Sequence, residues 1–388
     1  MNLKSDAKDT APRIILSANT AWFITNFCTG LIKALRQNGY EPLVVAPSDA
    51  SASRVLQRLG IDQVEVNVDR SGLNPLADVL LPLSYRRILR RTRAAAYFGF
   101  TIKPNVYGAL AARSLGIAAI PNVSGLGTAF MKRGALQWLV THLYRTAFRR
   151  LPTIFFQNTE DLELFVRRRI VQSEQAKLLP GLGIDLERFS PAELPGGDPI
   201  FLLVGRILRD KGVVEFAEAA CKLRKLLPAA RFQLLGPLDE GNRTAVKRAD
   251  IDRWVSQGII EYLGSTDDVR PFIADSTAVV LPSYREGLPG SLLEGAAMGR
   301  PLIATNVPGC RDVVNDGVNG YLCEVRNANS LADSMQRLAD LPLAERRAMG
   351  TAGRRMVERR FSDALAARCY LDALEHLPRR RVPDDIWG

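Results

Sequence analysis

The stretch Ala278-Val-Val-Leu-Pro-Ser-Tyr-Arg-Glu-Gly-Leu-Pro-Gly-Ser-Leu-Leu-Glu294 predicts a strand, a loop and a helix, in that order. Its apolar run, residues 278–281, is typical of a buried strand, and the Gly and Pro residues that follow predict a tight loop before a helix at 291–298. The first turn of a helix has unpaired N–H groups that favour an anion. Carboxylates at Glu286 and Glu294 flank this point, and a carboxylate is better suited to hydroxyls than to phosphates. The motif therefore indicates a ligand that carries both groups.

A second loop after a predicted strand carries cations that such a ligand needs. Val204-Gly-Arg-Ile-Leu-Arg-Asp-Lys-Gly212 follows a predicted strand at 199–204 and leads into a predicted helix at 211–227. Arg206 can grip a diphosphate through two parallel hydrogen bonds, and Lys211 supplies a mobile point charge. Each charge-assisted contact is worth about 1.5–3 kcal/mol. Alone, this loop is equally well explained as a basic helix cap, but the two nearby carboxylates of the first motif favour a binding site.

The rest of the chain alternates short apolar strands with helical segments, which predicts parallel sheets covered by helices on both faces. A stretch rich in Gly and Pro at 180–198 predicts a domain boundary, with an N-terminal domain at 1–190 and a C-terminal domain at 191–388. The expected α/β architecture is two doubly wound, Rossmann-like domains that face a central cleft, where ligands bind at the carboxyl ends of the strands. We expect the last helix, at 362–377, to pack back on the first domain, and residues 19–26 to form a polar and aromatic loop before a helix at 27–37.

The charge is unevenly distributed along the 388 residues. The chain carries a net charge of +11, and the segment from Val79 to Thr159 holds 12 Lys and Arg residues but no Asp or Glu. A long segment with one sign of charge favours an anionic partner such as phospholipid headgroups, a diphosphate or nucleic acid, although a merely solvated basic face remains an alternative. The five cysteines show no C-x-x-C spacing, which favours a reducing compartment. The polar first ten residues lack the apolar core of a signal peptide, so a cytoplasmic location is expected.

Taken together, these motifs resemble the retaining glycosyltransferases of family 4, which have the GT-B fold. The resemblance is carried by the two motifs above, by Met298-Gly-Arg-Pro-Leu-Ile-Ala304 and by Asn315-Asp-Gly-Val-Asn-Gly-Tyr321. The N-terminal half, with Asn19-Thr-Ala-Trp-Phe-Ile-Thr-Asn26 and Asn122-Val-Ser-Gly-Leu-Gly127, is similar to the bacterial enzymes that extend undecaprenyl-diphosphate-linked sugars, such as the bacillosaminyl-lipid N-acetylgalactosaminyltransferases. The resemblance covers nearly the whole chain and is most specific over residues 200–325.

The resemblance implies that the chain transfers a hexose or N-acetylhexosamine from a nucleotide sugar, with UDP favoured, to a polyprenyl-diphosphate-linked sugar in glycan or surface polysaccharide assembly. Arg206 and Lys211 would neutralise the leaving diphosphate, Glu286 would bind sugar hydroxyls and Glu294 would bind the ribose. No metal or other cofactor is expected, because the family usually needs none. The catalytic candidates are Arg206, Lys211 and Glu286, and the donor-binding candidates are Gly205, Arg206, Lys211, Glu286, Gly287, Leu288, Pro289, Gly290 and Glu294.

The N-terminal half is expected to supply the acceptor side. Basic stretches with apolar neighbours can lie on an anionic membrane, where a polyprenyl diphosphate is embedded, so we expect a peripheral position on the inner face of the plasma membrane. The alternative is that these are ordinary amphipathic helices packed on the sheet. Candidate membrane contacts are Arg86, Arg87, Arg90, Arg91, Arg149 and Arg150, and candidate donor or acceptor contacts are Asn19, Thr20, Asn26, Ser124 and Gly125.

Other functions are consistent with parts of this pattern. A GT-B enzyme with a soluble acceptor or a nucleotide-sugar epimerase would share the donor motifs. A basic nucleic-acid-binding protein would share the charge, but no nucleic-acid-binding motif accompanies it, and no nucleic acid partner is expected. Glu286 and Glu294 do not suggest a glycosidase pair, because one lies on a loop and the other lies inside a helix.

Overall fold

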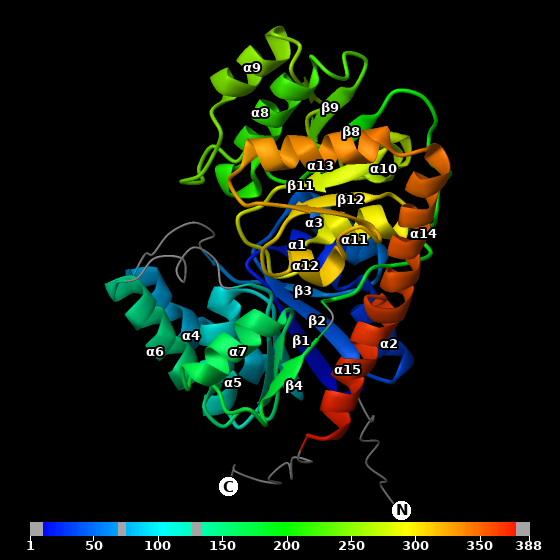
Figure 1. Cartoon of the computed structure of the whole chain (residues 1–388). Helices are drawn as coiled ribbons and strands as arrows, with labels where there is room; N and C mark the ends of the chain where they lie inside the picture. The colour runs from blue at the N-terminus through cyan, green and yellow to red at the C-terminus, as the bar shows by residue number, and fades with distance from the viewer. Residues whose placement is uncertain (1–10, 69–74, 126–133, 180, 378–388) are drawn as a thin grey trace, which may run out of the picture.

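A computed structural model of the chain describes residues 11–68, 75–125, 134–179 and 181–377. It contains two sheets, each with helices on both faces, and every pairing between their strands is parallel (Figure 1). The strand orders are β3-β2-β1-β4-β5-β6-β7 and β10-β9-β8-β11-β12-β13. The predicted α/β architecture of two parallel-sheet domains is thereby confirmed.

The first sheet and its helices come from the N-terminal half of the chain. The described residues between β7 and β8 belong to neither sheet. The strands are β1 (Arg13–Ser17), β2 (Glu41–Ala46), β3 (Gln63–Glu65), β4 (Ala96–Gly99), β5 (Ala118–Val123), β6 (Ile154–Phe156) and β7 (Ala176–Leu178). The helices are α1 (Ala21–Phe27), α2 (Thr29–Gln37), α3 (Ala50–Arg58), α4 (Pro75–Arg91), the π-helical turn η1 (Pro104–Gly108), α5 (Ala109–Ser114), α6 (Ala135–Phe148) and α7 (Thr159–Arg167).

The second sheet and its helices come from the C-terminal half. The strands are β8 (Ile200–Val204), β9 (Arg231–Leu235), β10 (Glu261–Tyr262), β11 (Ala278–Leu281), β12 (Leu302–Thr305) and β13 (Gly320–Cys323). The helices are the 3-10 turn η3 (Arg209–Lys211), α8 (Val213–Leu223), α9 (Arg248–Ser256), α10 (Arg270–Asp275), α11 (Gly290–Ala297), α12 (Cys310–Val313), α13 (Ala328–Asp340), α14 (Leu343–Arg360) and α15 (Asp363–Glu375).

Each sheet has an apolar core on both faces because side chains alternate along a strand. In β1, Ile15 packs into one core, and its neighbours Ile14 and Leu16 pack into the other. In β8, Leu203 and Leu202 divide in the same way. Strands buried on both faces read as short continuous apolar runs, which is why the sequence revealed most of them.

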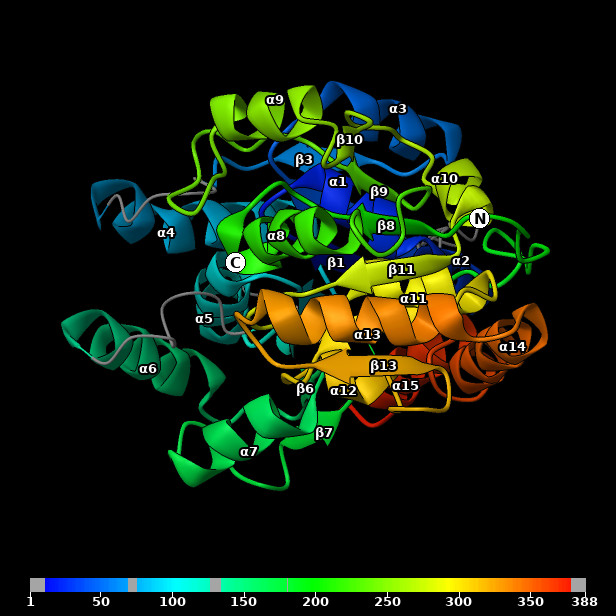
Figure 2. The ribbon, with the colours of Figure 1, turned by 45° about the horizontal axis from the view of Figure 1, so that its top comes forward.

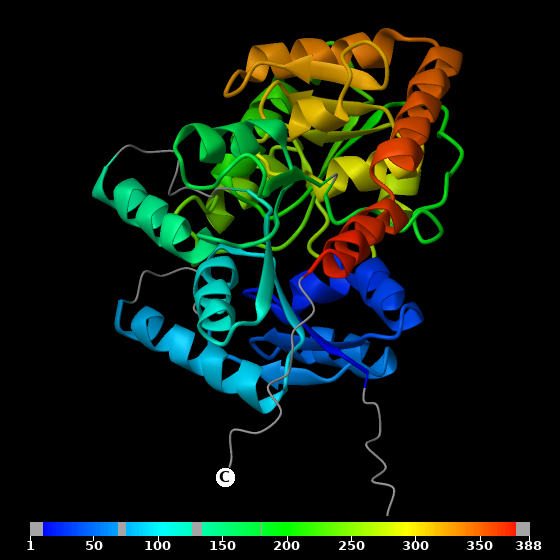
Figure 3. The same ribbon diagram turned by 90° about the horizontal axis from the view of Figure 1, so that it is seen from below.

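The last helix belongs to the second half of the chain but packs on the first sheet. Tyr370 of α15 is fully buried in the core that also contains residues of α2, and its hydroxyl accepts a hydrogen bond from Nδ2 of Asn122 at 2.9 Å. Figure 3 shows α15 beside α2. The two halves are therefore joined by this return of the chain as well as by the segment between β7 and β8.

The segment that follows β1 differs from the expected loop. Residues Ala21–Phe27 form helix α1, because the hydroxyl of Thr20 caps the amide of Phe23 at 3.0 Å and because Ala21, Ile24 and Thr25 bury one face. The expected helix at 27–37 begins instead at Thr29. The sequence of this segment has few strong helix formers, so packing decides its structure.

Two arginines fix the segment before β8 to the second half of the chain. Arg300 is fully buried and donates to the carbonyls of Ala192 and Glu193, while Arg354 of α14 donates to the carbonyl of Phe189 at 2.8 Å. Burial lowers the pKa of Arg300 to about 10. In the described part of the chain, no helix combines the length and the apolar character needed to cross a membrane.

Candidate functional site

The loops that follow β8 and β11 cross each other at the carboxyl edge of the second sheet. Lys211 ends the 3-10 turn, and Gly212 then takes the left-handed conformation with φ of 73°. A Cβ at Gly212 would lie only 2.1 Å from the carbonyl oxygen of Pro282, so only glycine fits at this crossing. The amide of Tyr284 also donates to the carbonyl of Asp210 at 2.9 Å. The backbone therefore places Lys211 beside the loop that carries Glu286.

Both candidate cations form ion pairs across the site. Nζ of Lys211 lies 2.5 Å from Oε1 of Glu286, and these side chains are 24% and 12% exposed. Nη1 of Arg206 lies 3.0 Å from Oδ2 of Asp239, in the loop after β9, and this pair is more open, with 55% and 34% of the side chains exposed. A phosphate can replace a carboxylate as the partner of either cation, because both are oxygen anions that accept charge-assisted hydrogen bonds. The structure thus places both predicted cations beside carboxylates: Glu286, which was predicted, and Asp239, which was not.

Glu294 lies one turn inside α11 and differs from Glu286 in its surroundings. Among the described residues, no donor forms a hydrogen bond with its carboxylate. Burial raises the pKa of Glu294 to about 7, and the positive charge of Arg188 opposes that rise. A half-buried carboxylate whose hydrogen-bonding capacity is unused by the described residues can accept two hydroxyl hydrogens at once.

Residues Glu286–Gly290, called the motif loop below, contact the N-terminal half directly. A Cβ at Gly287 would lie 1.8 Å from the carbonyl oxygen of Ser124, and a Cβ at Gly125 would lie 3.5 Å from the backbone of Gly287. At the other end of the loop, a Cβ at Gly290 would lie 3.2 Å from the ring of Phe27, at the end of α1. Helix α1 and the loop after β5 therefore pack against the motif loop and form the N-terminal wall opposite it.

The polar side chains predicted on that opposite wall are engaged with their own backbone. Thr20 caps α1, Asn26 donates to the carbonyl of Trp22 at 2.9 Å, and Ser124 donates to the carbonyl of Phe100 at 3.0 Å. The amide of Asn19 donates to the hydroxyl of Thr101 at 2.9 Å. These contacts stabilise the wall, and a role of these side chains in binding the donor or the acceptor stays a prediction.

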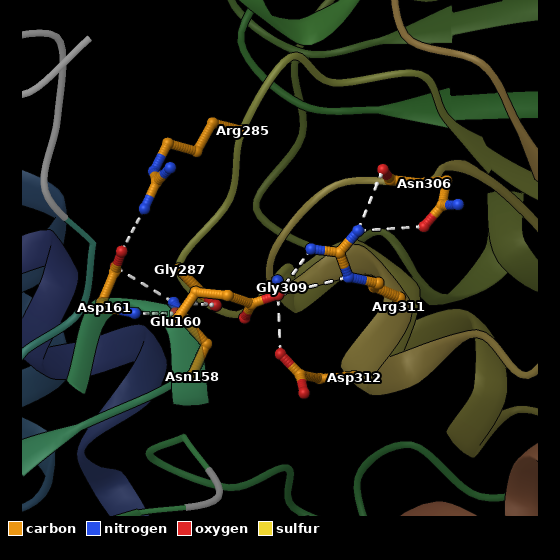
Figure 4. A network of polar contacts seen from close by, with 9 residues as sticks. All are labelled: Asn158, Glu160, Asp161, Arg285, Gly287, Asn306, Gly309, Arg311 and Asp312. Atoms are coloured by element: carbon orange, nitrogen blue, oxygen red, sulfur yellow. Dashed lines mark hydrogen bonds and ion pairs between the residues drawn. The ribbon is translucent and has the colours of Figure 1, made fainter. Parts of the chain in front are cut away.

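A polar network joins α7 of the N-terminal half to the motif loop (Figure 4). Nδ2 of Asn158 donates to the carbonyl of Gly287 at 3.1 Å and to Oδ2 of Asp161 at 3.0 Å. Asp161 also pairs with Arg285, the residue before the motif loop. Burial raises the pKa of Asp161, and Arg285 opposes that rise. On the outside of the network, Arg311 of α12 pairs with Glu160 at 2.5 Å.

Sequence reasoning overlooked Asp239 and this network, although both left weak signals. Asp239 follows the predicted strand at 231–235, at the same sheet edge as the two motifs, and could have been found by applying the same rule to every strand of the second half. Asn158 and Asp161 have the spacing of a helix N-cap, which is a structural signal. Nothing in the sequence indicates that this cap faces the motif loop.

The basic, acid-free segment lies mostly on α4, α5 and α6, and Figure 2 shows these helices on one side of the N-terminal half. Of the predicted membrane contacts, Arg86 is held by the hydroxyl of Ser114 at 2.7 Å, and the other five are exposed. Large apolar side chains also point outward from α4 and α6, as the apolar neighbours of the basic stretches led us to expect. They are Leu80, Leu83, Trp138 and Leu139, with 46–64% of their surface exposed.

No cluster of three or more His, Cys, Asp or Glu residues able to hold a metal ion occurs within the residues described above. An Asp-x-Asp sequence, of a kind that can hold a divalent cation, is present at Asp250 and Asp252. Both residues lie on α9, where they pair with Arg253 and Arg248 at 2.8 Å. Their charges are thus balanced by arginines outside the cleft.

Comparison with known proteins identifies both halves. A family model described as "Glycosyl transferase 4-like domain" matches residues 24–181, and one described as "Glycosyl transferases group 1" matches residues 198–340. The chain is 27% identical, over 338 residues, to N,N'-diacetylbacillosaminyl-diphospho-undecaprenol alpha-1,3-N-acetylgalactosaminyltransferase of Campylobacter jejuni, covering 82% of this chain and 86% of the relative. It is 25% identical, over 279 residues, to an Escherichia coli UDP-Gal:alpha-D-GlcNAc-diphosphoundecaprenol alpha-1,3-galactosyltransferase, covering 68% and 71%.

Solved structures show the same fold at lower identity. HepE of Anabaena, crystallised with UDP and glucose, superposes with a TM-score of 0.77 at 17% identity, covering 94% of this chain and all of that one. A glycosyltransferase of Rickettsia africae superposes with a TM-score of 0.75 at 18% identity, covering 94% and 98%. The arrangement of two parallel sheets around a cleft is therefore that of GT-B proteins.

Proposed function

We propose that this chain, which belongs to the glycosyltransferases of the GT-B fold, moves a hexose or N-acetylhexosamine from a UDP-linked sugar to a polyprenyl-diphosphate-linked sugar, with retention of configuration. The observation that carries the proposal is the pairing of Lys211 with Glu286 at the carboxyl edge of the second sheet. A cation for a diphosphate and a carboxylate for hydroxyls stand there side by side. The choice of acceptor is supported by the two undecaprenyl-diphosphate-sugar transferases to which the chain is similar over most of its length.

The donor would bind with its charged and hydroxylated parts on different residues. Arg206 and Lys211 would exchange their carboxylate partners for the diphosphate, which frees Glu286 to accept hydrogen bonds from the sugar. Glu294 would accept the two ribose hydroxyls, because its carboxylate has no protein donor among the described residues. Backbone N–H groups of the motif loop, including those at the start of α11, would face the sugar and its phosphate.

The reaction would break the bond between the anomeric carbon and the diphosphate oxygen, which keeps the electron pair. Negative charge develops on the diphosphate as that bond breaks, and Arg206 and Lys211 would stabilise it. The acceptor hydroxyl would attack from the same face and pass its proton to the departing diphosphate, which accounts for retention. Because these two cations neutralise the leaving group, the proposal requires no bound metal.

The acceptor side would rest on an anionic membrane through α4 and α6. Cationic side chains attract anionic headgroups by about 1 kcal/mol each near the surface. Exposed Leu80, Leu83, Trp138 and Leu139 would enter the interface, as apolar faces of membrane-surface helices do. We therefore place the protein in the cytoplasm, on the inner face of the plasma membrane.

Cosedimentation with anionic and neutral vesicles tests the membrane contact. Leu83→Ser should weaken binding to anionic vesicles, and high salt should weaken it further because the charge attraction is screened. Leu226→Ser is a matched control, because Leu226 is as exposed as Leu83 (61% against 62%) but lies in the C-terminal half. Equal binding by both variants, or no binding of the wild type at low salt, would remove the membrane from the proposal.

The transfer reaction is tested by offering a panel of nucleotide sugars with a polyprenyl-diphosphate-linked sugar or with the same sugar lacking the lipid. We expect transfer from at least one UDP-sugar, and only to the lipid-linked acceptor. Equal transfer to the free sugar would favour an enzyme with a soluble acceptor. Interconversion of the nucleotide sugar without transfer would favour an epimerase.

A further inference from the structure

Arg285 and the first two residues of the motif loop, Glu286 and Gly287, are held from two different halves of the chain. Arg285 is paired with Asp161, and the carbonyl of Gly287 accepts a hydrogen bond from Asn158 at 3.1 Å, both from the N-terminal turn of α7 (Figure 4). Glu286, between them, pairs within its own half. Separation of the two halves would thus release the residues on either side of Glu286 while Glu286 kept its partner.

The amide of Asn158 does more than cap a helix. Its oxygen accepts from the amide of Asp161 at 2.8 Å, and its nitrogen donates both to the carboxylate of Asp161 and to Gly287. Asn158 is 1% exposed, so water does not compete for these contacts. Serine and aspartate cap helices as well as asparagine does. Neither has the two N–H donors that Asn158 uses, so the requirement for asparagine comes from the contact across the cleft.

The hydrogen bond to Gly287 sets the direction of a backbone donor. A peptide unit is planar and trans, so its C=O and its N–H point in opposite directions. The amide N–H of Leu288 shares a peptide unit with the carbonyl that Asn158 holds. This N–H has no hydrogen-bond acceptor among the described residues. By holding the carbonyl of Gly287 on one side of the peptide, Asn158 therefore directs the N–H of Leu288 to the opposite side.

The surrounding packing gives this peptide little room to rotate. A Cβ at Gly287 would lie 1.8 Å from the carbonyl oxygen of Ser124, and a Cβ at Gly309 would lie 2.5 Å from the carbonyl oxygen of Gly287. The neighbour on one side belongs to the N-terminal half, and the neighbour on the other belongs to the C-terminal half. The orientation of the peptide is thus determined only when both halves are together.

We propose that Asn158 is a positioning residue for sugar transfer, which holds the Gly287 carbonyl from across the cleft and so aims the Leu288 N–H at the donor when the halves close. The buried pair of Asp161 with Arg285 keeps the two halves in register for this contact. The inference rests on the proposed function, because it takes the motif loop to be the donor-binding loop. It assigns to α7 a part in catalysis that depends on closure of the cleft.

The test compares Asn158→Ser with Asn327→Ser in the full-length protein. Asn327 caps α13, and its Nδ2 also donates to a carboxylate, that of Glu324 at 2.7 Å, but it lies outside the cleft network. Both substitutions keep a capping oxygen, but Asn158→Ser also leaves the buried carbonyl of Gly287 without its donor, so we expect the melting temperature to fall further in Asn158→Ser than in Asn327→Ser. We expect kcat/KM for the UDP-sugar to fall about tenfold in Asn158→Ser and to stay within twofold in Asn327→Ser, because one oriented hydrogen bond is lost.

Further measurements distinguish positioning from a general loss of structure. UDP affinity of Asn158→Ser should stay within twofold of the wild type, since Arg206, Lys211 and Glu294 are untouched, and the loss should appear in kcat. Arg285→Gln, on the other side of the cleft, should lower kcat in the same way. The double variant should lose less than the product of the two single effects, because both act on one peptide. Equal kcat/KM in Asn158→Ser and Asn327→Ser would overturn the inference.

Small-angle scattering separates failure of this inference from failure of the proposed function. If the wild type transfers no sugar, the proposed function fails, but the contact across the cleft can still be measured. Asn158→Ser and Arg285→Gln should then give a larger radius of gyration than Asn327→Ser with UDP present. Identical radii in all of these variants would overturn the role of Asn158 independently of activity.

Discussion

The two walls of the cleft differ in what their polar side chains bind. On the C-terminal wall, Arg206 and Lys211 pair with carboxylates of other loops. On the N-terminal wall, Thr20, Asn26 and Ser124 bind backbone groups near them. A phosphate can displace a carboxylate from a cation, but a ligand gains little by displacing a neutral hydrogen bond that completes a helix cap or a loop. The partner of a polar residue therefore indicates, more than its position does, whether that residue is available to a ligand.

The largest expected difference between the walls comes from removing one polar group on each. Lys211→Ala should lower turnover about 100-fold, because it removes a charge that stabilises the leaving diphosphate and leaves Glu286 without its partner. Ser124→Ala should change turnover less than threefold, because its hydroxyl only donates to the carbonyl of Phe100. Steady-state transfer assays of both variants check this.

Comparable losses in these two variants would contradict the distinction between the walls. A control for folding is available in the melting temperatures, since Ser124→Ala removes a single neutral hydrogen bond worth about 1 kcal/mol. If Lys211→Ala retained wild-type turnover, the assignment of the diphosphate to this cation would be wrong.

The same contrast explains how much could be predicted from sequence. Residues 200–325 place their strands, glycines and charges within two short motifs. Local spacing was therefore enough to select Arg206, Lys211, Glu286 and Glu294 as candidates and to predict that they lie at one sheet edge. The architecture followed from the alternation of strands and helices. The candidate residues and the architecture depend on residues close in sequence, or on the general rule that ligands bind at the carboxyl ends of parallel strands.

What could not be predicted depends on contacts between distant residues. Asn158 meets Gly287 across 129 positions, and Asp161 meets Arg285 across 124, and neither pair has a sequence pattern of its own. Helix α1 was predicted to be a loop, because its residues are poor helix formers and only packing against the first sheet decides its structure. The candidate contacts on the N-terminal wall were chosen from their place in the sequence and from the resemblance, neither of which reveals the backbone groups that engage them.

Glu294 on the C-terminal wall, to which none of the described residues donates, should make UDP binding depend on pH. Because its pKa in the free protein is about 7, it binds a proton at pH 6 and must lose it to accept two ribose hydrogens. UDP affinity should therefore fall about tenfold between pH 8 and pH 6, with a proton released on binding. Calorimetry in buffers of different ionisation enthalpy measures both quantities.

Glu294→Gln is the control for that titration. It should bind UDP more weakly at pH 8, without the tenfold pH dependence. The sign for stability is the opposite of that for binding. An unfolded carboxyl group is ionised above about pH 4.3, so between that pH and 7 the folded state binds more protons and this group stabilises the protein as the pH falls. A pH-independent affinity in the wild type would remove Glu294 from the nucleotide site.

The smallest expected effect is a gain of affinity for UDP. Asp239 competes with a diphosphate for Arg206, so Asp239→Asn should tighten UDP binding by up to about fivefold, because a surface ion pair is worth about 0.2–1 kcal/mol. Glu261→Gln is the matched control, because Glu261 pairs with Arg231 at 2.7 Å and the two side chains are exposed to a similar degree. This pair involves the first residue of β9, whereas Asp239 follows the last residue of that strand, at the opposite edge of the sheet. Calorimetry at low salt should detect the gain in the first variant only. A loss of affinity in Asp239→Asn would mean that Asp239 holds Arg206 in its binding position. The ion pairs of this wall would then stabilise the site and would not be displaced by a donor.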